Sequence, residues 1–209
     1  DGTYDLFSMQ SPNRRIERSN SNINFLNTNY SLKNDLTEYE AKNFFLEGTG
    51  SLVLDRVNKN AYMAESNRSN VSLASKWSQL RGYDLVHFKS YIDKKPTYHT
   101  NVLMFITNKF AGICFDSISD SKNLLSNIEK THKILNLSIE QVKNFSGNAI
   151  VVRNINNEAK FLISTSGLKA FDLIQKRFIE KYYDIVDINI PTIEKIGGGS
   201  VRCMVLELF

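Results

Sequence analysis

Short apolar runs separated by polar turns recur along this chain, and this pattern is typical of β-strands. The predicted strands are residues 4–9, 52–54, 61–64, 83–88, 102–106, 110–115, 149–152, 161–164 and 184–190. Polar residues at 55–60 and 154–157 predict hairpin loops between neighbouring strands. The polar, Asn-rich segment 20–34 is predicted as a loop.

Helical spacing of apolar residues appears between some of these strands. Residues 69–80 place Val71, Leu73, Ala74, Trp77 and Leu80 on one face, with Ser69 at the start and Arg81-Gly82 at the end. Further helices are predicted over 121–135 and most of 167–182, and a turn over 145–148. The order is a repeated strand–strand–helix–strand unit of about 50 residues, which favours a mixed α/β fold.

Composition excludes several classes of protein. The 209 residues are 42% hydrophobic and 23% charged, as in an ordinary globular domain, and the net charge of +4 is not gathered into a basic run typical of nucleic-acid binding. No apolar stretch reaches the ~18 residues of a membrane helix. Because the sequence opens with the polar residues 1–5, we expect no signal peptide in it. Cys114 and Cys203 are too few for a disulfide framework or a zinc site, so we expect free thiols in the cytoplasm and no metal.

The segment 197–208 combines three glycines, a short Ser-Val-Arg linker, Cys203 and an apolar, strand-like run. Glycine lets the main chain approach a ligand closely, so this loop could present the Cys203 thiolate, beside Arg202, to a small substrate. The alternative is a turn before a buried strand, with Cys203 as a small core residue. Cys114, inside a predicted strand, is interpreted as core.

Glu47 stands between the apolar run 44–46 and the small-residue turn 48–50. A carboxylate between buried strands must be paired or functional, because burying it alone is costly. The alternative is a Glu that caps the turn from the solvent side. His99 stands at the edge of an apolar strand, where a pocket edge is expected. We interpret His87, within a strand, and His132, within the polar helix 121–135, as structural or solvated.

Three arginines fall within five residues after Pro12, at positions 14, 15 and 18. They are either the start of a solvated charged helix or a grip for an anion or a carboxylate.

Several segments, taken together, resemble one family. They are Phe-Leu-Glu-Gly-Thr-Gly-Ser at 45–51, Tyr-His-Thr-Asn at 98–101 and Gly-Gly-Gly-Ser-Val-Arg-Cys-Met at 197–204, supported by 11–18, 145–148 and 190–194. In this order they resemble the guanidino-group-modifying superfamily, the penteins, which includes arginine deiminases, dimethylargininases and amidinotransferases. The arginine-deiminase-related branch of citrulline-utilisation hydrolase type is the most similar. The resemblance covers essentially the whole chain.

The resemblance implies an α/β fold, the pentein pseudo-fivefold propeller, with about four of its five ββαβ units in this chain. Residues 1–209 would form a single amidinotransferase/arginine-deiminase-like catalytic domain. The family's first unit would lie before Asp1, which agrees with an Asp1-Gly2 turn that has no strand before it. We therefore expect a fragment of a longer chain.

Site residues are also implied by the resemblance. Cys203 would be the nucleophile, His99 the general acid and base, and Glu47 the carboxylate that grips the guanidinium. Arg15, Asn101 and Asn148 would bind the substrate. The implied reaction hydrolyses a C–N bond of an arginine-, methylarginine- or citrulline-like molecule through a covalent S-amidino intermediate. No cofactor, metal, nucleic acid or membrane is implied.

One position departs from the arginine deiminases, which carry His-x-Asp where this chain has His99-Thr100-Asn101. An Asn holds a guanidinium more weakly than an Asp, so Asn101 indicates a different specificity. Amidino transfer to an amine and a non-enzymatic binding role remain the alternatives, and the joint presence of Glu47, His99 and Cys203 argues against the second. A homodimer is left open.

Overall fold

A repeated ββαβ unit organises the computed structural model, which describes residues 2–208; Asp1 of the predicted N-terminal turn lies outside them. Within residues 2–208 the strands form three three-stranded sheets and two two-stranded sheets. The first three-stranded sheet joins β3 (Val53–Asp55), β4 (Asn60–Ala64) and β5 (Asp84–Phe88), with α4 (Val71–Arg81) before β5. β3 and β4 are antiparallel, whereas β4 and β5 are parallel, so the helix crosses over between the parallel strands.

The next two units repeat this connectivity. β8 (Met104–Ile106), β9 (Phe110–Ile113), α5 (Lys122–Ile128) and β10 (Lys133–Asn136) form one unit. β11 (Ile150–Arg153), β12 (Ala159–Ser164), α7 (Thr165–Ala170), α8 (Leu173–Glu180) and β13 (Asp184–Ile188) form the other. Near the N-terminus, β1 (Thr3–Leu6) pairs in parallel with β2 (Ser31–Asp35), and α2 (Asn20–Asn29) connects them. The predicted strand–strand–helix–strand repeat is confirmed.

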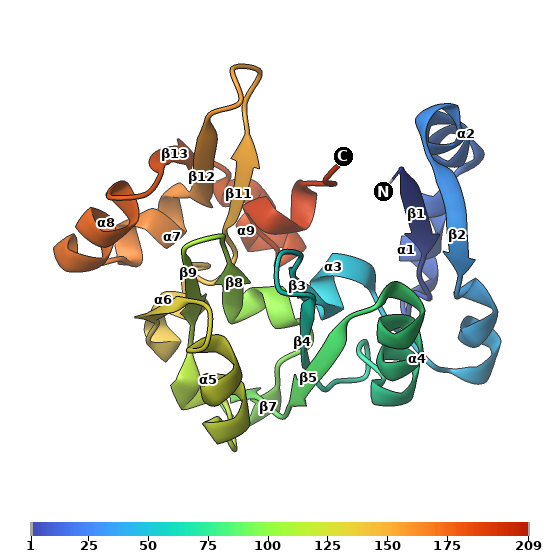
Figure 1. The fold of residues 1–209 in the computed structure, drawn as a ribbon, viewed down its shortest axis with the longest axis horizontal. Helices are drawn as coiled ribbons and strands as arrows, with labels where there is room; N and C mark the ends of the chain where they lie inside the picture. The colour runs from blue at the N-terminus through green and yellow to red at the C-terminus, as the bar shows by residue number, and fades with distance from the viewer. Residues whose placement is uncertain (1, 209) are drawn as a thin grey trace.

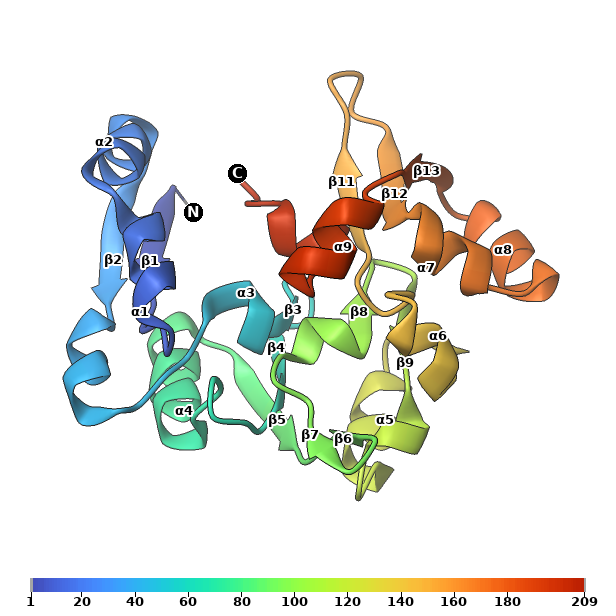
Figure 2. The same cartoon turned by 180° about the vertical axis from the view of Figure 1, so that it is seen from behind.

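Short elements link these units. They are α1 (Pro12–Arg15), η1 (Ile16–Arg18), η2 (Thr37–Lys42), α3 (Gly48–Ser51), β6 (Tyr91–Ile92), β7 (Lys95–Pro96), η3 (Thr100–Val102), η4 (Phe115–Ser117), α6 (Ile139–Lys143), α9 (Pro191–Gly197) and η5 (Val201–Met204). The β1–β2 pair and α8 lie at opposite ends of the molecule, with α3, η3 and α9 between them (Figures 1 and 2). The candidate site is built from these intervening elements.

Two apolar clusters support the units. The larger cluster packs side chains of all three units together around the fully buried rings of Phe110 and Phe161. Phe105 meets Phe161 edge to face, with ring centroids 5.2 Å apart. The smaller cluster packs α4, through Trp77, on the first sheet and on Leu46, the residue before Glu47.

Several sequence predictions were wrong at the level of single elements. Residues 20–34 hold α2 and β2, not a loop, and the Ser19 side chain caps α2 by accepting from the Asn22 amide. The predicted helix 121–135 ends at Ile128, and residues 133–136 pair with β9 instead. His132 is therefore in the connection between them, and it is buried. Residues 31–35 and 133–136 form strands because the free energy gained by pairing with a distant strand exceeds their weak local preference for a loop or a helix.

The C-terminal part also differs from the prediction. Residues 191–197 form α9, with Gly198 as its left-handed C-cap, and no helix was predicted between the strand 184–190 and the glycine loop. Cys203 lies in η5, and residues 205–208 form no strand. The predicted helix 167–182 is interrupted near Asp172, whose side chain caps the second part, α8.

Phe161 offers a direct test of the larger core. Phe161→Ala removes a fully buried ring from the contact with Phe105 and Phe110, so we expect it to lower the free energy of unfolding by about 3–5 kcal/mol. Urea denaturation measures this loss. The same substitution at Phe25, which is 58% exposed, is the control and should change stability by less than about 1 kcal/mol. Equal effects at both positions would contradict this description of the core.

Candidate active site

Glu47 precedes α3, and its carboxylate is completely buried. One oxygen, Oε1, accepts a hydrogen bond of 2.9 Å from the Gln10 amide. The other, Oε2, lies 2.7 Å from Arg14 Nη1 and 2.8 Å from His99 Nε2. Both oxygens are therefore engaged by protein groups, and the alternative of a solvent-facing cap is wrong.

His99 directly precedes η3, and its ring packs against α3. The imidazole covers Gly50 of α3 so closely that a Cβ at position 50 would lie 2.8 Å from the ring. Thr100 fixes η3 against α3, because its hydroxyl donates to the Ser51 carbonyl and accepts from the Ala64 amide. Gly50 of the 48–50 turn is therefore required on steric grounds, because a larger residue there would collide with the His99 ring.

Burial and charge set the protonation of this pair. Burial alone would raise the pKa of Glu47, but the hydrogen bonds from His99 and the Gln10 amide, with the charge of Arg14, hold that pKa below its ordinary value. Burial lowers the pKa of His99, against the opposing pull of Glu47, and the charges of Arg68 and Arg14 lower it further. The site therefore favours an ionised carboxylate beside a neutral imidazole.

Cys203 lies in η5 and is exposed, so its interpretation as a core residue is wrong, whereas Cys114 is buried as predicted. Asn148 Nδ2 donates to the Cys203 sulfur at 3.3 Å and to the Asn101 carbonyl at 2.8 Å. The Oδ1 atom of Asn148 accepts from the Arg202 amide at 3.0 Å. The structure thus brings together three of the predicted residues, Cys203, Asn148 and Asn101.

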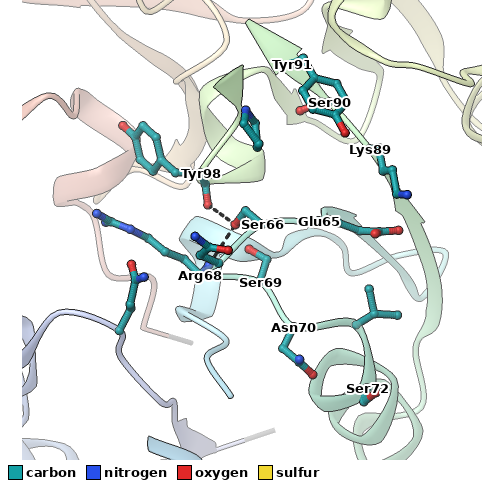
Figure 3. A pocket seen from close by; sticks show the side chains of 14 residues that line it. Glu65, Ser66, Arg68, Ser69, Asn70, Ser72, Lys89, Ser90, Tyr91 and Tyr98 are labelled. Atoms are coloured by element: carbon teal, nitrogen blue, oxygen red, sulfur yellow. Dashed lines mark hydrogen bonds between the residues drawn. The ribbon is translucent and has the colours of Figure 1, made fainter. Parts of the chain in front are cut away.

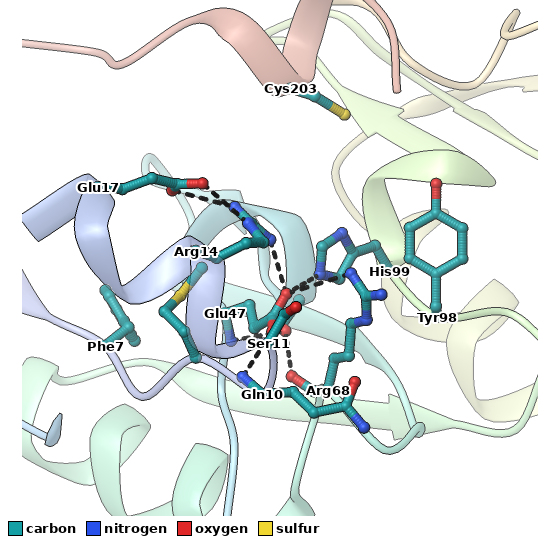
Figure 4. A network of polar contacts seen from close by, with 12 residues as sticks. Phe7, Gln10, Ser11, Arg14, Glu17, Glu47, Arg68, Tyr98, His99 and Cys203 are labelled. Carbon is teal, nitrogen blue, oxygen red and sulfur yellow. Dashed lines mark hydrogen bonds and ion pairs between the residues drawn. The ribbon is translucent and has the colours of Figure 1, made fainter. Parts of the chain in front are cut away.

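The Cys203 side chain points to the side on which His99 and Tyr98 lie (Figure 4). Tyr98 connects the two halves of the site, since its hydroxyl donates to the Gly198 carbonyl at 2.8 Å. Burial raises the pKa of Tyr98, and the charge of the nearby Cys203 raises it further. Within residues 2–208 no hydrogen bond joins Cys203 to His99, so the two groups do not form a contact pair.

Arg15, predicted to bind substrate, is not brought to this site. Its Nε atom contacts the Met9 carbonyl and Glu40, 3.1 Å away in each case. Its neighbour Arg14 reaches Glu47 instead, and the Arg68 Nη1 atom lies 3.7 Å from the same carboxylate. Sequence reasoning missed Arg68 and Tyr98, whose guanidinium and ring are stacked 5.2 Å apart. The cluster of arginines at 14–18 was the available signal for Arg14.

Arg202 was expected beside the thiolate, yet its guanidinium is directed elsewhere. It donates to the Val205 carbonyl and pairs with Glu207 at 3.1 Å. Arg202 therefore holds the chain after Cys203, and only its main-chain amide takes part in the site.

A polar cavity of about 560 Å³ adjoins the network (Figure 3). Gln10, Arg68 and Tyr98 belong to both, while Glu65, Asn70 and Lys89 line the cavity farther away. In the part of the chain that the structure describes, no group of three or more His, Cys, Asp or Glu side chains could hold a metal ion. No helix among the described residues is long and apolar enough to cross a membrane.

The lowered pKa values predict how stability depends on pH. Below about pH 6.5, the ordinary pKa of histidine, His99 is protonated in the unfolded state before it is protonated in the folded state. Below about pH 4.5, the ordinary pKa of glutamate, the same holds for Glu47. The unfolded state then holds more protons, so the free energy of unfolding should fall as pH is lowered through each window. Urea titrations at several pH values measure this slope. His99→Gln should flatten it near pH 6.5, and an unchanged slope would contradict the assignment.

Comparisons with known proteins confirm the fold. The N-terminal domain of ArgZ, a cyanobacterial arginine dihydrolase solved with bound product, is 14% identical with a TM-score of 0.74, over 99% of this chain and 70% of that one. Apo ArgZ is 13% identical with a TM-score of 0.73, and the match covers 97% of this chain but only 30% of ArgZ. SxtG, an amidinotransferase from Microseira wollei, is 12% identical with a TM-score of 0.62, over 95% of this chain and 62% of SxtG.

No curated protein sequence matched this chain. A family model did, over residues 1–209, and its description is N,N dimethylarginine dimethylhydrolase, eukaryotic. The pentein fold and the guanidino-modifying superfamily predicted from the sequence are thereby confirmed. The chain belongs to the eukaryotic N,N-dimethylarginine dimethylhydrolase family.

Proposed function

We propose that this chain carries a cysteine-dependent hydrolase site for a C–N bond of a guanidino or ureido small molecule. The observation that carries the proposal is the placement of an exposed Cys203, held by Asn148, facing the side of a buried His99–Glu47 pair. These groups come from separate units of the fold, and each is fixed by contacts of its own. Because Cys203 acts as a free thiol, the proposal places the protein in a reducing compartment such as the cytosol.

The proposed reaction begins when the neutral imidazole of His99 takes the thiol proton of Cys203, and the thiolate so formed attacks the central guanidinium carbon. The C–N bond to the departing amine breaks, and His99 supplies the proton that the amine takes with it. The intermediate is an S-amidino adduct on Cys203. His99, now deprotonated, accepts a proton from water as the water attacks, and the thiolate leaves with the ureido product. Loss of the amine in the first step and regeneration of the thiolate in the second balance the cycle.

The contacts of Glu47 favour a role that differs from the one expected from sequence. A carboxylate that grips a guanidinium in the bidentate way uses both of its oxygens, yet Oε2 of Glu47 already accepts from Arg14 and His99, and Oε1 accepts from the Gln10 amide. We therefore assign Glu47 to orienting His99 and stabilising its protonated form during the reaction. Asn101 and Asn148 remain the proposed contacts for the reacting group, since both side chains lie beside the sulfur.

Arg68 replaces Arg15 as the proposed partner for a substrate carboxylate. Its closest contact with a carboxylate is long, at 3.7 Å, so its donors are not saturated as those of Arg14 are by Glu17 and Glu47. The side chain also lines the polar cavity, which leaves room for the chain of an amino-acid substrate. Methylated arginine is the first substrate to test, because the family description names it.

The central test measures ureido product and released amine from dimethylarginine, arginine and citrulline. Cys203→Ala should reduce turnover by at least about a thousandfold, because the nucleophile is removed. Cys114→Ala is the matched control and should retain most of the turnover, since that thiol is buried in the core. Turnover that survives in Cys203→Ala would overturn the proposal. Product that forms only when an amine acceptor is added would favour amidino transfer.

A pair of arginine variants tests the binding of a substrate carboxylate. Arg68→Gln should raise KM about tenfold with kcat changed less, because a charge-assisted hydrogen bond to the substrate is lost. Arg15→Gln should leave KM within about threefold, because that side chain contacts Glu40 and the Met9 carbonyl. The reverse order of effects in steady-state kinetics would restore Arg15 as the substrate-binding arginine.

A further inference from the structure

Glu194 of α9 is a buried carboxylate outside the network just described. Its Oε1 atom accepts from the Ser200 hydroxyl at 2.6 Å, and its Oε2 atom accepts from the Ser166 hydroxyl of α7. No ion pair to Glu194 occurs among residues 2–208. A carboxylate held only by two hydroxyls is costly to bury, so its stabilising effect on the fold alone is a weak reason for its presence.

Ser200 connects Glu194 to the nucleophile. It is fully buried and precedes η5, and its carbonyl accepts from the Cys203 amide at 3.0 Å. The carboxylate therefore fixes the side chain of Ser200, and the main chain of Ser200 fixes the turn that carries the sulfur. Asn148 holds the same turn from the other side, through the Arg202 amide.

The backbone at Gly199 lies next to the Cys203 thiol, so the position of the loop 198–200 affects the position of the sulfur. A Cβ at position 199 would lie 3.3 Å from the Cys203 sulfur, so the loop backbone passes directly beside it. A small shift of the loop at Ser200 would consequently move the sulfur relative to Asn148.

We propose that Glu194 is a positioning residue, which holds the loop 198–200 so that the Cys203 sulfur stays against Asn148. The inference rests on the proposed function of Cys203 but concerns a residue that does not touch the reacting atoms. Because the carboxylate accepts with both oxygens, an amide of the same shape loses one acceptor and the negative charge, and the loop loses its charge-assisted hydrogen bond.

The test is a double-mutant cycle between Glu194 and Ser200. Glu194→Gln and Ser200→Ala should each lower kcat about tenfold, with KM within about threefold, because orientation and not binding is lost. The double variant should also lose about tenfold, since both changes remove one interaction. Ser166→Ala leaves the Glu194–Ser200 hydrogen bond in place and should lower kcat less than threefold. The exposed Glu180→Gln is the matched surface control.

A loss of about a hundredfold in the double variant would overturn the inference, because the two residues would then act independently. So would an unchanged kcat in Glu194→Gln when thermal unfolding shows the variant folded. Alkylation of Cys203 by iodoacetamide, followed by mass spectrometry, provides a readout that does not require turnover. Loss of the Asn148 donor should slow it about threefold in Glu194→Gln and Ser200→Ala, but not in Ser166→Ala.

If wild type turns over none of the substrates, the proposed function fails, and the alkylation rates still decide the role of Glu194. Equal alkylation rates in wild type, Glu194→Gln and Ser200→Ala would overturn the positioning role.

Discussion

The buried carboxylate of Glu47 is the constraint on which the arrangement of the site depends. Its ionised form must be satisfied by donors, and these come from the N-terminal segment, from the loop before α4 and from the start of η3. Segments that are distant in sequence are thereby held around one group. Burial beside this carboxylate lowers the pKa of His99, and the charges of Arg68 and Arg14 lower it further, against the opposing pull of Glu47 itself.

Repeated ββαβ units provide a rigid frame, and the functional groups lie on the short connections between them. His99 and Asn101 lie around η3, Asn148 lies on the turn before β11, and Cys203 lies on the turn after α9. Because both ends of each connection are anchored in a rigid sheet or helix, the side chains on these short connections keep fixed positions. Two glycines have specific steric reasons: Gly50 makes room for the imidazole, and Gly147 approaches the Val102 carbonyl so closely that a Cβ would lie 2.3 Å from it.

Local patterns predicted the parts of the fold in which sequence and tertiary preference agree. Helix α4 was found from its apolar spacing and its Gly82 end, and the strand pairs on either side of the polar hairpins were found from short apolar runs that flank a polar loop. The prediction failed where a segment is polar or ambiguous on its own. Strands β2 and β10 form because a neighbouring strand pairs with each of them in parallel. The partner strand lies more than 20 residues away in the sequence, so a local sequence pattern does not predict the pairing.

For the site, the sequence by itself determined which residue types are present and in what order, and through their resemblance to a known superfamily it identified Cys203, His99, Glu47, Asn101 and Asn148 as candidates. Only the tertiary structure decided how they are used. It placed Arg68 beside the network and Arg15 against Glu40, and it directed both oxygens of Glu47 toward protein donors. The physical reason is that hydrogen bonds and burial depend on directions in space, which the spacing of residues along a chain does not fix.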